Sequence, residues 1–264
     1  MRDLVSRLLD GYSDLAFTQA NVIPWSCPVP VFGNLSTSYV GTLGLNPSNR
    51  EFVDVFGNEL VGRDRRFETL NSLKLTRWSD ARISHIRRLW NACQTYFSNN
   101  PYDQWFRKLD VLISDTRASY YFATASHLDL IPYATACKWG QLSQMQKQLL
   151  LNASGNSLAL SLCQSGIRLL VLNGASVVSL FQSMFGVKLE QQRMDDWTLR
   201  SRGAARVAGY SYVGSVSSLA GISLDRTVTV VGFNHNIQSS FGVTREVTDS
   251  IRLWIGQVGE EAFA

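Results

Sequence analysis

Four largely apolar runs, separated by segments of helical pattern, constrain the fold of this chain most strongly. The runs are residues 38–45, 119–131, 167–172 and 227–233, and each has the pattern of a buried strand. Strands that are apolar along most of their length are typical of a parallel sheet covered on both faces. The sequence therefore predicts an α/β fold with helices packed against a parallel sheet.

Helical segments lie between and around these runs. Apolar residues recur at the spacing of one helix face in residues 2–17, 80–98, 141–164, 175–185 and 244–258. Residues 188–226 are polar and rich in Ser and Gly, and we expect a hairpin or a mobile insertion there. We expect a single domain over residues 1–264, with an N-terminal helical extension at about 1–25 and this possible insertion.

Composition adds two weaker constraints. With 264 residues, of which 45% are hydrophobic and 17% charged, the chain has enough apolar material for a full core. The formal net charge of +4 slightly favours a polyanionic partner, although a mild positive charge is often only a matter of composition.

The cysteines indicate a reducing compartment. Cys27, Cys93, Cys137 and Cys163 include no Cys-x-x-Cys pair, which favours buried thiols over disulfides and differs from structural zinc or iron–sulfur sites. Residues 1–17 mix charged and apolar residues, unlike a signal peptide or a membrane span. We expect a cytoplasmic protein with no cofactor, no metal and no membrane contact.

A polar cluster follows each predicted strand. The clusters are residues 46–52, 127–132, 173–174 and 234–241. Ligands of parallel α/β sheets bind beyond the carboxyl ends of the strands. We therefore expect the four clusters to meet at one edge of the sheet.

Three of these strand ends carry a family resemblance. Residues 44–48, Gly-Leu-Asn-Pro-Ser, resemble the first motif of the uracil-DNA glycosylase superfamily, closest to the G-x-N-P-G form of its mismatch-specific, thymine-DNA glycosylase-like branch. Residues 170–175 are similar to the L-L-W-G strand end of that superfamily. Residues 233–240 resemble its H-P-S-P-L-S motif, which precedes the last helix. The order and spacing of the motifs agree over residues 38–250.

The resemblance implies a fold, a reaction and a partner. The implied fold is a three-layer α/β/α sandwich around a central four-stranded parallel sheet. The implied activity is that of a monofunctional DNA glycosylase, which flips a modified or damaged pyrimidine out of DNA and hydrolyses its N-glycosidic bond. We expect such an enzyme to be monomeric and to need neither a metal nor a cofactor.

Asn46 and His235 are the expected catalytic residues. Bond cleavage requires an acceptor that orients water and a donor that stabilises the departing base. The Asn46 amide would orient water through its carbonyl oxygen, and His235 would face the base. The alternatives are a turn-forming Asn46 and a hydrogen-bonded loop histidine. Glu51 is a reserve general base, or else an acid that stabilises a helix N-terminus.

Ser48, His127 and Asp129 bear on the target base. The uracil-specific branch has a tyrosine at the position of Ser48, and serine leaves the space beside the pyrimidine 5-position open. His127 and Asp129 stand where the uracil readers present an amide, and a carboxylate accepts from the exocyclic amine of cytosine. These residues predict a 5-substituted cytosine, such as glucosylated cytosine, which would suit defence against phages. The alternatives are repair of uracil or mismatched thymine, and a structural His–Asp pair.

The remaining candidates are contacts with DNA. Phe56 resembles the aromatic residue that stacks on the flipped base, with a core phenylalanine as the alternative. Arg63 and Arg66 form a candidate phosphate patch or a solvated face. The loop after the last strand suits the minor groove through Ile237, Gln238, Ser239 and Ser240. A non-catalytic nucleic-acid-binding relative is the alternative to an enzyme, and the absence of G-x-x-x-x-G-K disfavours a nucleotide-processing hydrolase.

Overall fold

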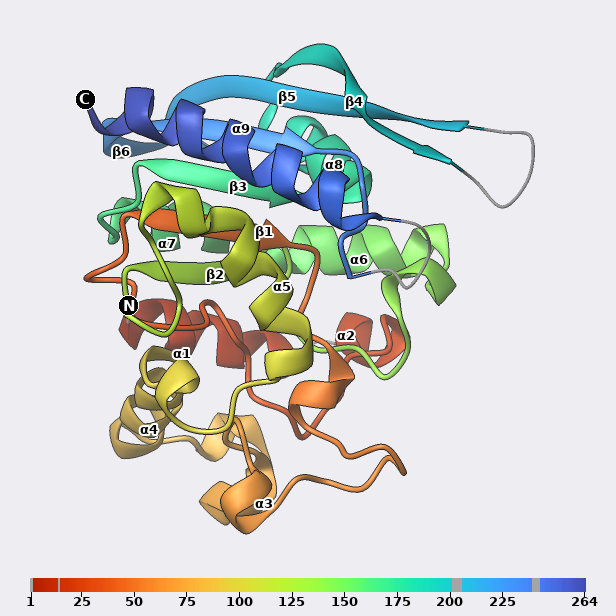
Figure 1. The fold of residues 1–264 in the computed structure, drawn as a ribbon. Helices are drawn as coiled ribbons and strands as arrows, with labels where there is room; N and C mark the ends of the chain where they lie inside the picture. The colour runs from red at the N-terminus through yellow and green to blue at the C-terminus, as the bar shows by residue number, and fades with distance from the viewer. Residues whose placement is uncertain (1, 14, 201–205, 239–242) are drawn as a thin grey trace.

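The computed structural model describes residues 2–13, 15–200, 206–238 and 243–264. Within these ranges, six strands form one sheet in the order β2-β1-β3-β6-β5-β4 (Figure 1). The strands are β1 (Val40–Gly44), β2 (Ala125–Asp129), β3 (Leu169–Asn173), β4 (Glu190–Arg200), β5 (Arg206–Leu219) and β6 (Ile222–Phe233).

Four neighbouring strands of the sheet are parallel and the two at one edge are antiparallel. β1 pairs in parallel with β2 and with β3, and β3 pairs in parallel with β6. β5 is antiparallel to β6, and β4 is antiparallel to β5. The predicted α/β class is confirmed. The predicted four-stranded parallel sheet is wrong, because the sheet is six-stranded and mixed.

Residues 188–226 account for this difference. They contain β4, β5 and the start of β6, so the hairpin that we expected as one alternative for this segment extends the sheet beyond β6. In β5 the buried residues are isolated among partly or fully exposed ones, as is usual for an antiparallel strand with one wet face. Such a strand lacks a continuous apolar run. The search for apolar runs, which identified the four parallel strands, therefore did not identify β5.

Helices cover both faces of the sheet (Figure 1). α5 and α9 pack against each other in front of the strands, whereas α7 and α8 contact β6 from behind. The helices are α1 (Arg2–Asp10), α2 (Leu15–Gln19), α3 (Leu70–Leu73), α4 (Ile83–Gln94), α5 (Asp103–Ile113), α6 (Gln144–Ser154), α7 (Ser157–Cys163), α8 (Ala175–Phe185) and α9 (Arg245–Phe263).

The helix predictions agree with the structure except in three respects. The single helix expected over residues 2–17 is wrong, because a 3-10 turn at Gly11–Ser13 separates α1 from α2. The helix expected over residues 141–164 is divided into α6 and α7 by Gly155, whose φ of 52° suits a residue without a side chain. The sequence pattern did not reveal α5, which supplies one wall of the site described below. In the expected N-terminal extension, α1 packs on α4 and α2 packs on α6.

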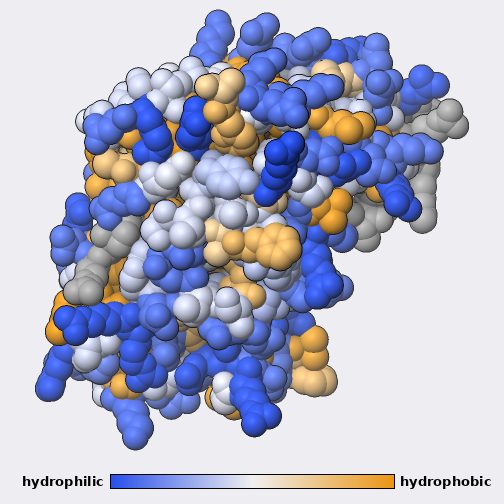
Figure 2. Space-filling view, turned by 60° about the vertical axis from the view of Figure 1, so that its left-hand side comes forward, coloured by the Kyte–Doolittle hydropathy of each residue, from blue (hydrophilic) through white to orange (hydrophobic). Residues whose placement is uncertain are grey.

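On the face shown in Figure 2, hydrophobic residues lie in small, separate patches. The orange hydrophobic groups are scattered among hydrophilic ones. Isolated apolar side chains of this kind are normal on folded proteins. No helix in the described ranges combines the length and the apolar character needed to cross a membrane.

Candidate active site

A cavity of about 830 Å³ lies at the carboxyl ends of the parallel strands. It is lined by residues that follow β1, β2, β3 and β6, together with the first turn of α8. The four polar clusters therefore meet at one edge of the sheet, as the sequence predicts. Representatives of the four clusters are Asn46, Glu51, His127, Asp129, Asn173 and Gln238.

Asn46 lines this cavity, and its amide nitrogen is held by neighbouring acceptors. Its Nδ2 donates to the Tyr133 carbonyl at 3.3 Å and to Thr135 Oγ1 at 3.1 Å. The Thr135 hydroxyl gives its own hydrogen to the Cys137 carbonyl at 2.8 Å, so toward Asn46 it can only accept. Because both neighbours accept, the atom that faces them must be the nitrogen of the Asn46 amide. The Asn46 Oδ1 atom has no hydrogen-bond partner among the described residues. Asn46 can therefore hold a water molecule by accepting a hydrogen bond.

Glu51 is a buried carboxyl group that lines the same cavity. It lies in a short 3-10 helix (Asn49–Glu51) that begins after Ser48, whose Oγ accepts from the Arg50 N–H at 3.2 Å. The Tyr96 hydroxyl donates to Glu51 Oε2 at 2.6 Å. Burial raises the pKa of Glu51 from its ordinary 4.5 to about 7, although the Tyr96 hydrogen bond and Arg66 act to lower it. A carboxyl group with a pKa near neutrality is suited to general base catalysis.

His127 and Asp129 lie side by side at the end of β2. Thr42 Oγ1 is 2.5 Å from the Tyr120 hydroxyl and 2.7 Å from His127 Nδ1, and His127 Nε2 is 3.4 Å from Asp129 Oδ1. One arrangement of protons satisfies every group: Tyr120 donates to Thr42, and Thr42 donates to Nδ1. The imidazole proton then sits on Nε2 and faces the carboxylate. Asp129 is held in place and can accept a hydrogen bond from a ligand.

Gly44 permits this close arrangement. A Cβ atom at position 44 would lie 2.4 Å from Asp129 Oδ1 and 2.9 Å from His127 Nε2. Any side chain at position 44 would collide with His127 and Asp129, so only glycine fits at this position of the motif. The two strands are neighbours in register, with Gly44 opposite Asp129.

An aromatic wall, which sequence reasoning missed, completes the cavity. The rings of Phe32, Trp105 and Phe106 line it and surround the His127 imidazole, with ring centroids 4.9–5.5 Å away. Trp105 and Phe106 belong to α5, and Phe32 belongs to a loop before β1. Flat apolar walls of this kind suit a planar ring such as a nucleobase.

The structure does not bring the His235 ring to the cavity lining. His235 Nε2 is 2.6 Å from the backbone carbonyl of Trp197 in β4, and the side chain is buried. Burial lowers the pKa of His235, and the hydrogen bond to Trp197 opposes this shift. The geometry matches the expected alternative, a hydrogen-bonded loop histidine, and gives no support to a catalytic role.

Phe56 is also placed away from the cavity. Its side chain is 86% exposed, so the core position that we expected as the alternative is wrong. Phe56 is not among the residues that line the cavity, and stacking on a flipped base stays a prediction. The Asp54 carboxylate accepts hydrogen bonds from the N–H groups of Phe56 and Asn58 at 2.8 and 2.9 Å. These bonds close a tight turn whose tip points outward.

The predicted DNA contacts fall into different environments. Ile237 is buried, which excludes it from an exposed wedge, whereas Gln238 lines the cavity. Ser239 and Ser240 lie outside the described residues. Arg66 donates to the Arg50 carbonyl at 2.6 Å and lies over the Tyr102 ring, and both of these residues line the cavity.

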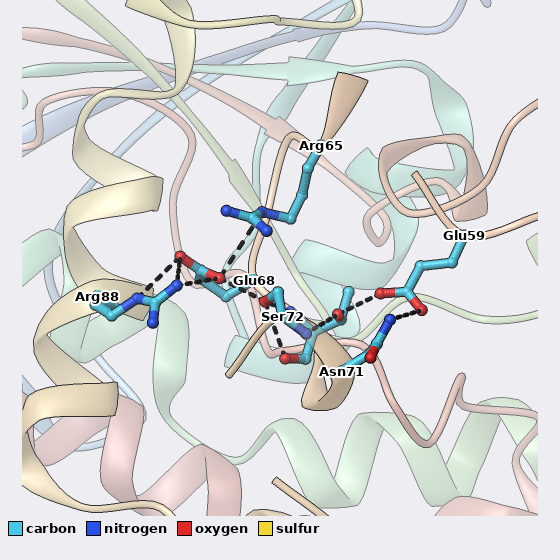
Figure 3. Close-up of polar contacts among 7 residues, drawn as sticks. Glu59, Arg65, Glu68, Asn71, Ser72 and Arg88 are labelled. Carbon is cyan, nitrogen blue, oxygen red and sulfur yellow. Dashed lines mark hydrogen bonds and ion pairs between the residues drawn. The ribbon is translucent and has the colours of Figure 1, made fainter. Parts of the chain in front are cut away.

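A second hollow, of about 770 Å³, is lined by arginines. Arg65 and Arg88 approach Glu68 from two sides, with nitrogen–oxygen distances of 3.8 and 3.0 Å (Figure 3). Arg63 and Arg87 also line the hollow and form no ion pair within the described part of the chain. The phosphate patch predicted at Arg63 and Arg66 therefore remains a prediction. Both residues line this hollow, but the Arg66 guanidinium donates to the backbone carbonyls of Arg50 and Asn100.

The described residues contain no group of three His, Cys, Asp or Glu side chains placed to hold a metal ion. No protein-family model matches the chain, and no curated protein is significantly similar to it.

Proposed function

We propose that this protein is a DNA glycosylase that hydrolyses the N-glycosidic bond of a flipped-out, 5-substituted cytosine. The observation that carries the proposal is the meeting of Asn46 and Glu51 with the His127–Asp129 pair in one cavity. The first two residues suit the handling of water, and the pair suits recognition of a base. The resemblance of residues 44–48 supports the same assignment.

The chemistry assigns different tasks to the amide and the carboxylate. Asn46 Oδ1 accepts a hydrogen bond from the attacking water, and Glu51 takes up its proton, because a carboxyl with a pKa of about 7 is partly ionised at neutral pH. The water oxygen bonds to C1′ of the deoxyribose, and the electron pair of the C1′–N1 bond leaves with the pyrimidine. The departing base takes a proton from solvent, so the products are a free base and an abasic site.

Asp129 supports a cytosine-type base. Its carboxylate accepts from an exocyclic amine, whereas the O4 carbonyl of uracil or thymine would face it with like polarity. This favours modified cytosine over the excision of uracil or mismatched thymine. The aromatic wall formed by Phe32, Trp105 and Phe106 would flank the flipped ring.

The size of the cavity supports a substituted base. A volume of about 830 Å³ is in the range of cavities that hold drug-sized ligands, so a flipped nucleotide whose base carries a substituent has room there. Ser48 lines the same space without a large side chain. A glycosylase of this specificity would act on phage genomes that carry modified cytosine, and we propose anti-phage defence as its role.

A base-release assay tests the proposal. The duplexes contain cytosine, 5-hydroxymethylcytosine, glucosylated 5-hydroxymethylcytosine, uracil or mismatched thymine. We expect release of a 5-substituted cytosine and a loss of about 100-fold in Asn46→Ala, because misplaced water reacts slowly. Asn152→Ala, which changes an exposed asparagine on α6, is the matched control. DNA binding that persists without release of any base would instead identify a non-catalytic binder.

A further inference from the structure

Two side-chain amides in the cavity leave part of their hydrogen-bonding capacity unused. Asn173 ends β3, Gln238 follows β6, and Asn173 Nδ2 donates to Gln238 Oε1 at 3.1 Å. The other two polar atoms, Asn173 Oδ1 and Gln238 Nε2, are buried and have no hydrogen-bond partner among the residues that the structure describes. Buried polar atoms without partners are uncommon, because each has lost its contact with water. A ligand that supplied both partners would satisfy the pair.

The unused capacity of this amide pair does not depend on how the amides are oriented. If both amides were rotated by 180°, Gln238 would donate to Asn173, and the free atoms would be one nitrogen and one oxygen again. In either arrangement the pair offers one donor and one acceptor. A matching ligand group must therefore accept one hydrogen bond and donate another.

The position of the pair separates it from the residues that would read the base. Asp129 ends β2 and Asn173 ends β3, with β1 between them. Neighbouring strands lie roughly 5 Å apart, so these two strand ends are separated by roughly 10 Å. A pyrimidine ring held by Asp129 is narrower than this distance. Asn173 and Gln238 thus face another part of the bound nucleotide.

The chemistry of DNA limits what that part can be. A phosphate group offers only acceptors and would place negative charge against the free amide oxygen. The deoxyribose within a DNA strand has no free hydroxyl, because O3′ and O5′ are esterified. A hydroxyl group on a base substituent both donates and accepts, so it fits the pair in either orientation. The hydroxyl of a 5-hydroxymethyl group stays close to the pyrimidine ring, whereas the hydroxyls of a sugar attached there extend further from the ring toward the pair.

We propose that Asn173 and Gln238 bind the hydroxyl groups of a sugar attached to the 5-position of the flipped pyrimidine. This inference rests on the proposed glycosylase activity and names the residues that select its substrate. The pair recognises a hexosyl substituent, while Asp129 recognises the cytosine ring.

The test compares 5-hydroxymethylcytosine with its glucosylated form in otherwise identical duplexes. Base release and duplex affinity are measured for the wild type, Gln238→Ala and Asn173→Asp. The aspartate keeps the shape of the asparagine but removes a donor. We expect each variant to lose about tenfold or more in kcat/KM or affinity for the glucosylated duplex. The hydroxymethyl duplex should change by less than about twofold, and Gln257→Ala, an exposed glutamine on α9, should match the wild type.

Two results separate this inference from the proposed function. Equal losses on both duplexes, or no loss on either, would overturn the role of the amide pair while leaving the glycosylase activity intact. If the wild type releases no base but binds the glucosylated duplex more tightly through Asn173 and Gln238, the sugar site stands and the glycosylase proposal falls. A wild type that shows neither release nor a preference for the sugar would reject both.

Discussion

The two strand-end histidines of this protein have opposite environments. His127, at the end of β2, lines the cavity and faces Asp129, whereas the ring of His235, after β6, is hydrogen-bonded to Trp197 in β4. His127 lies within β2 and His235 follows β6, so the backbones of both lie in or just beyond buried parallel strands. The direction of each ring is decided by its neighbours, which are Thr42 for His127 and the β4–β5 hairpin for His235. A strand end therefore locates a residue without establishing that it acts in the site.

Among the variants of the cavity and of His235, we expect the largest loss of activity from a change at Glu51, which follows β1. Glu51→Gln removes the base but retains an acceptor for the Tyr96 hydroxyl, so the fold should persist. Loss of general base catalysis should lower kcat/KM for base release by about 10²–10⁴-fold. Glu246→Gln, which changes an exposed acid in the first turn of α9, serves as the control. An unchanged rate in Glu51→Gln would remove Glu51 from the mechanism.

The same substitution should change how stability depends on pH. The pKa of Glu51 is about 7 in the folded protein and near 4.5 when unfolded, so the folded state holds this proton more tightly. The stability that it contributes is fully present below about pH 4.5 and is lost as the pH rises through about 7. Between pH 4.5 and pH 8, the free energy of unfolding of Glu51→Gln should therefore rise relative to that of the wild type by up to roughly 3 kcal/mol. Denaturant unfolding of both proteins at pH 4.5 and pH 8 measures this change. An equal difference in free energy of unfolding at the two pH values would contradict the prediction.

Asp129 tests the β2 side of the cavity. Asp129→Asn keeps the volume of the side chain but allows its amide to donate, which suits a carbonyl instead of an amine. We expect kcat/KM for a cytosine-type base to fall by about 10–100-fold relative to that for uracil. Competition between the two duplexes in one reaction measures the ratio directly. An unaltered ratio would mean that Asp129 supports His127 and does not contact the base.

His235 should affect stability more than activity. His235→Ala leaves the Trp197 carbonyl without its partner in a buried position, which should cost about 1–3 kcal/mol of unfolding free energy. Base release at a temperature where the variant is folded should stay within a few-fold of the wild type. If release instead fell as far as in Glu51→Gln, the two histidines would not differ in the way that the structure indicates.

Part of the site could be predicted from the sequence because parallel strands end at a common edge. That rule placed Asn46, His127 and Asp129 at the cavity, and it needed only the apolar runs before them. The rule could not identify Trp105, because this residue lies in α5 and not at the end of a strand. Only the packing of α5 in the folded protein brings Trp105 to the cavity. Nor could the rule orient His235, whose partner lies in a polar hairpin without the pattern of a buried strand.

The exposed position of Phe56 has a similar explanation. A phenylalanine in a loop is expected either to pack in the core or to contact a ligand. Here the Asp54 carboxylate closes the turn around the backbone of Phe56, and the local hydrogen bonds direct the ring outward. Sequence spacing from the first motif contains no information about this turn.

The pH dependence of base release tests the central claim most directly, namely that Glu51 activates water in this cavity. The rate on a glucosylated duplex should rise with pH as Glu51 loses its proton, and it should level off above about pH 7. In Glu51→Gln the remaining slow release should lose this inflection, while His235→Ala should keep it. An inflection that survives in Glu51→Gln and disappears in His235→Ala would contradict the account.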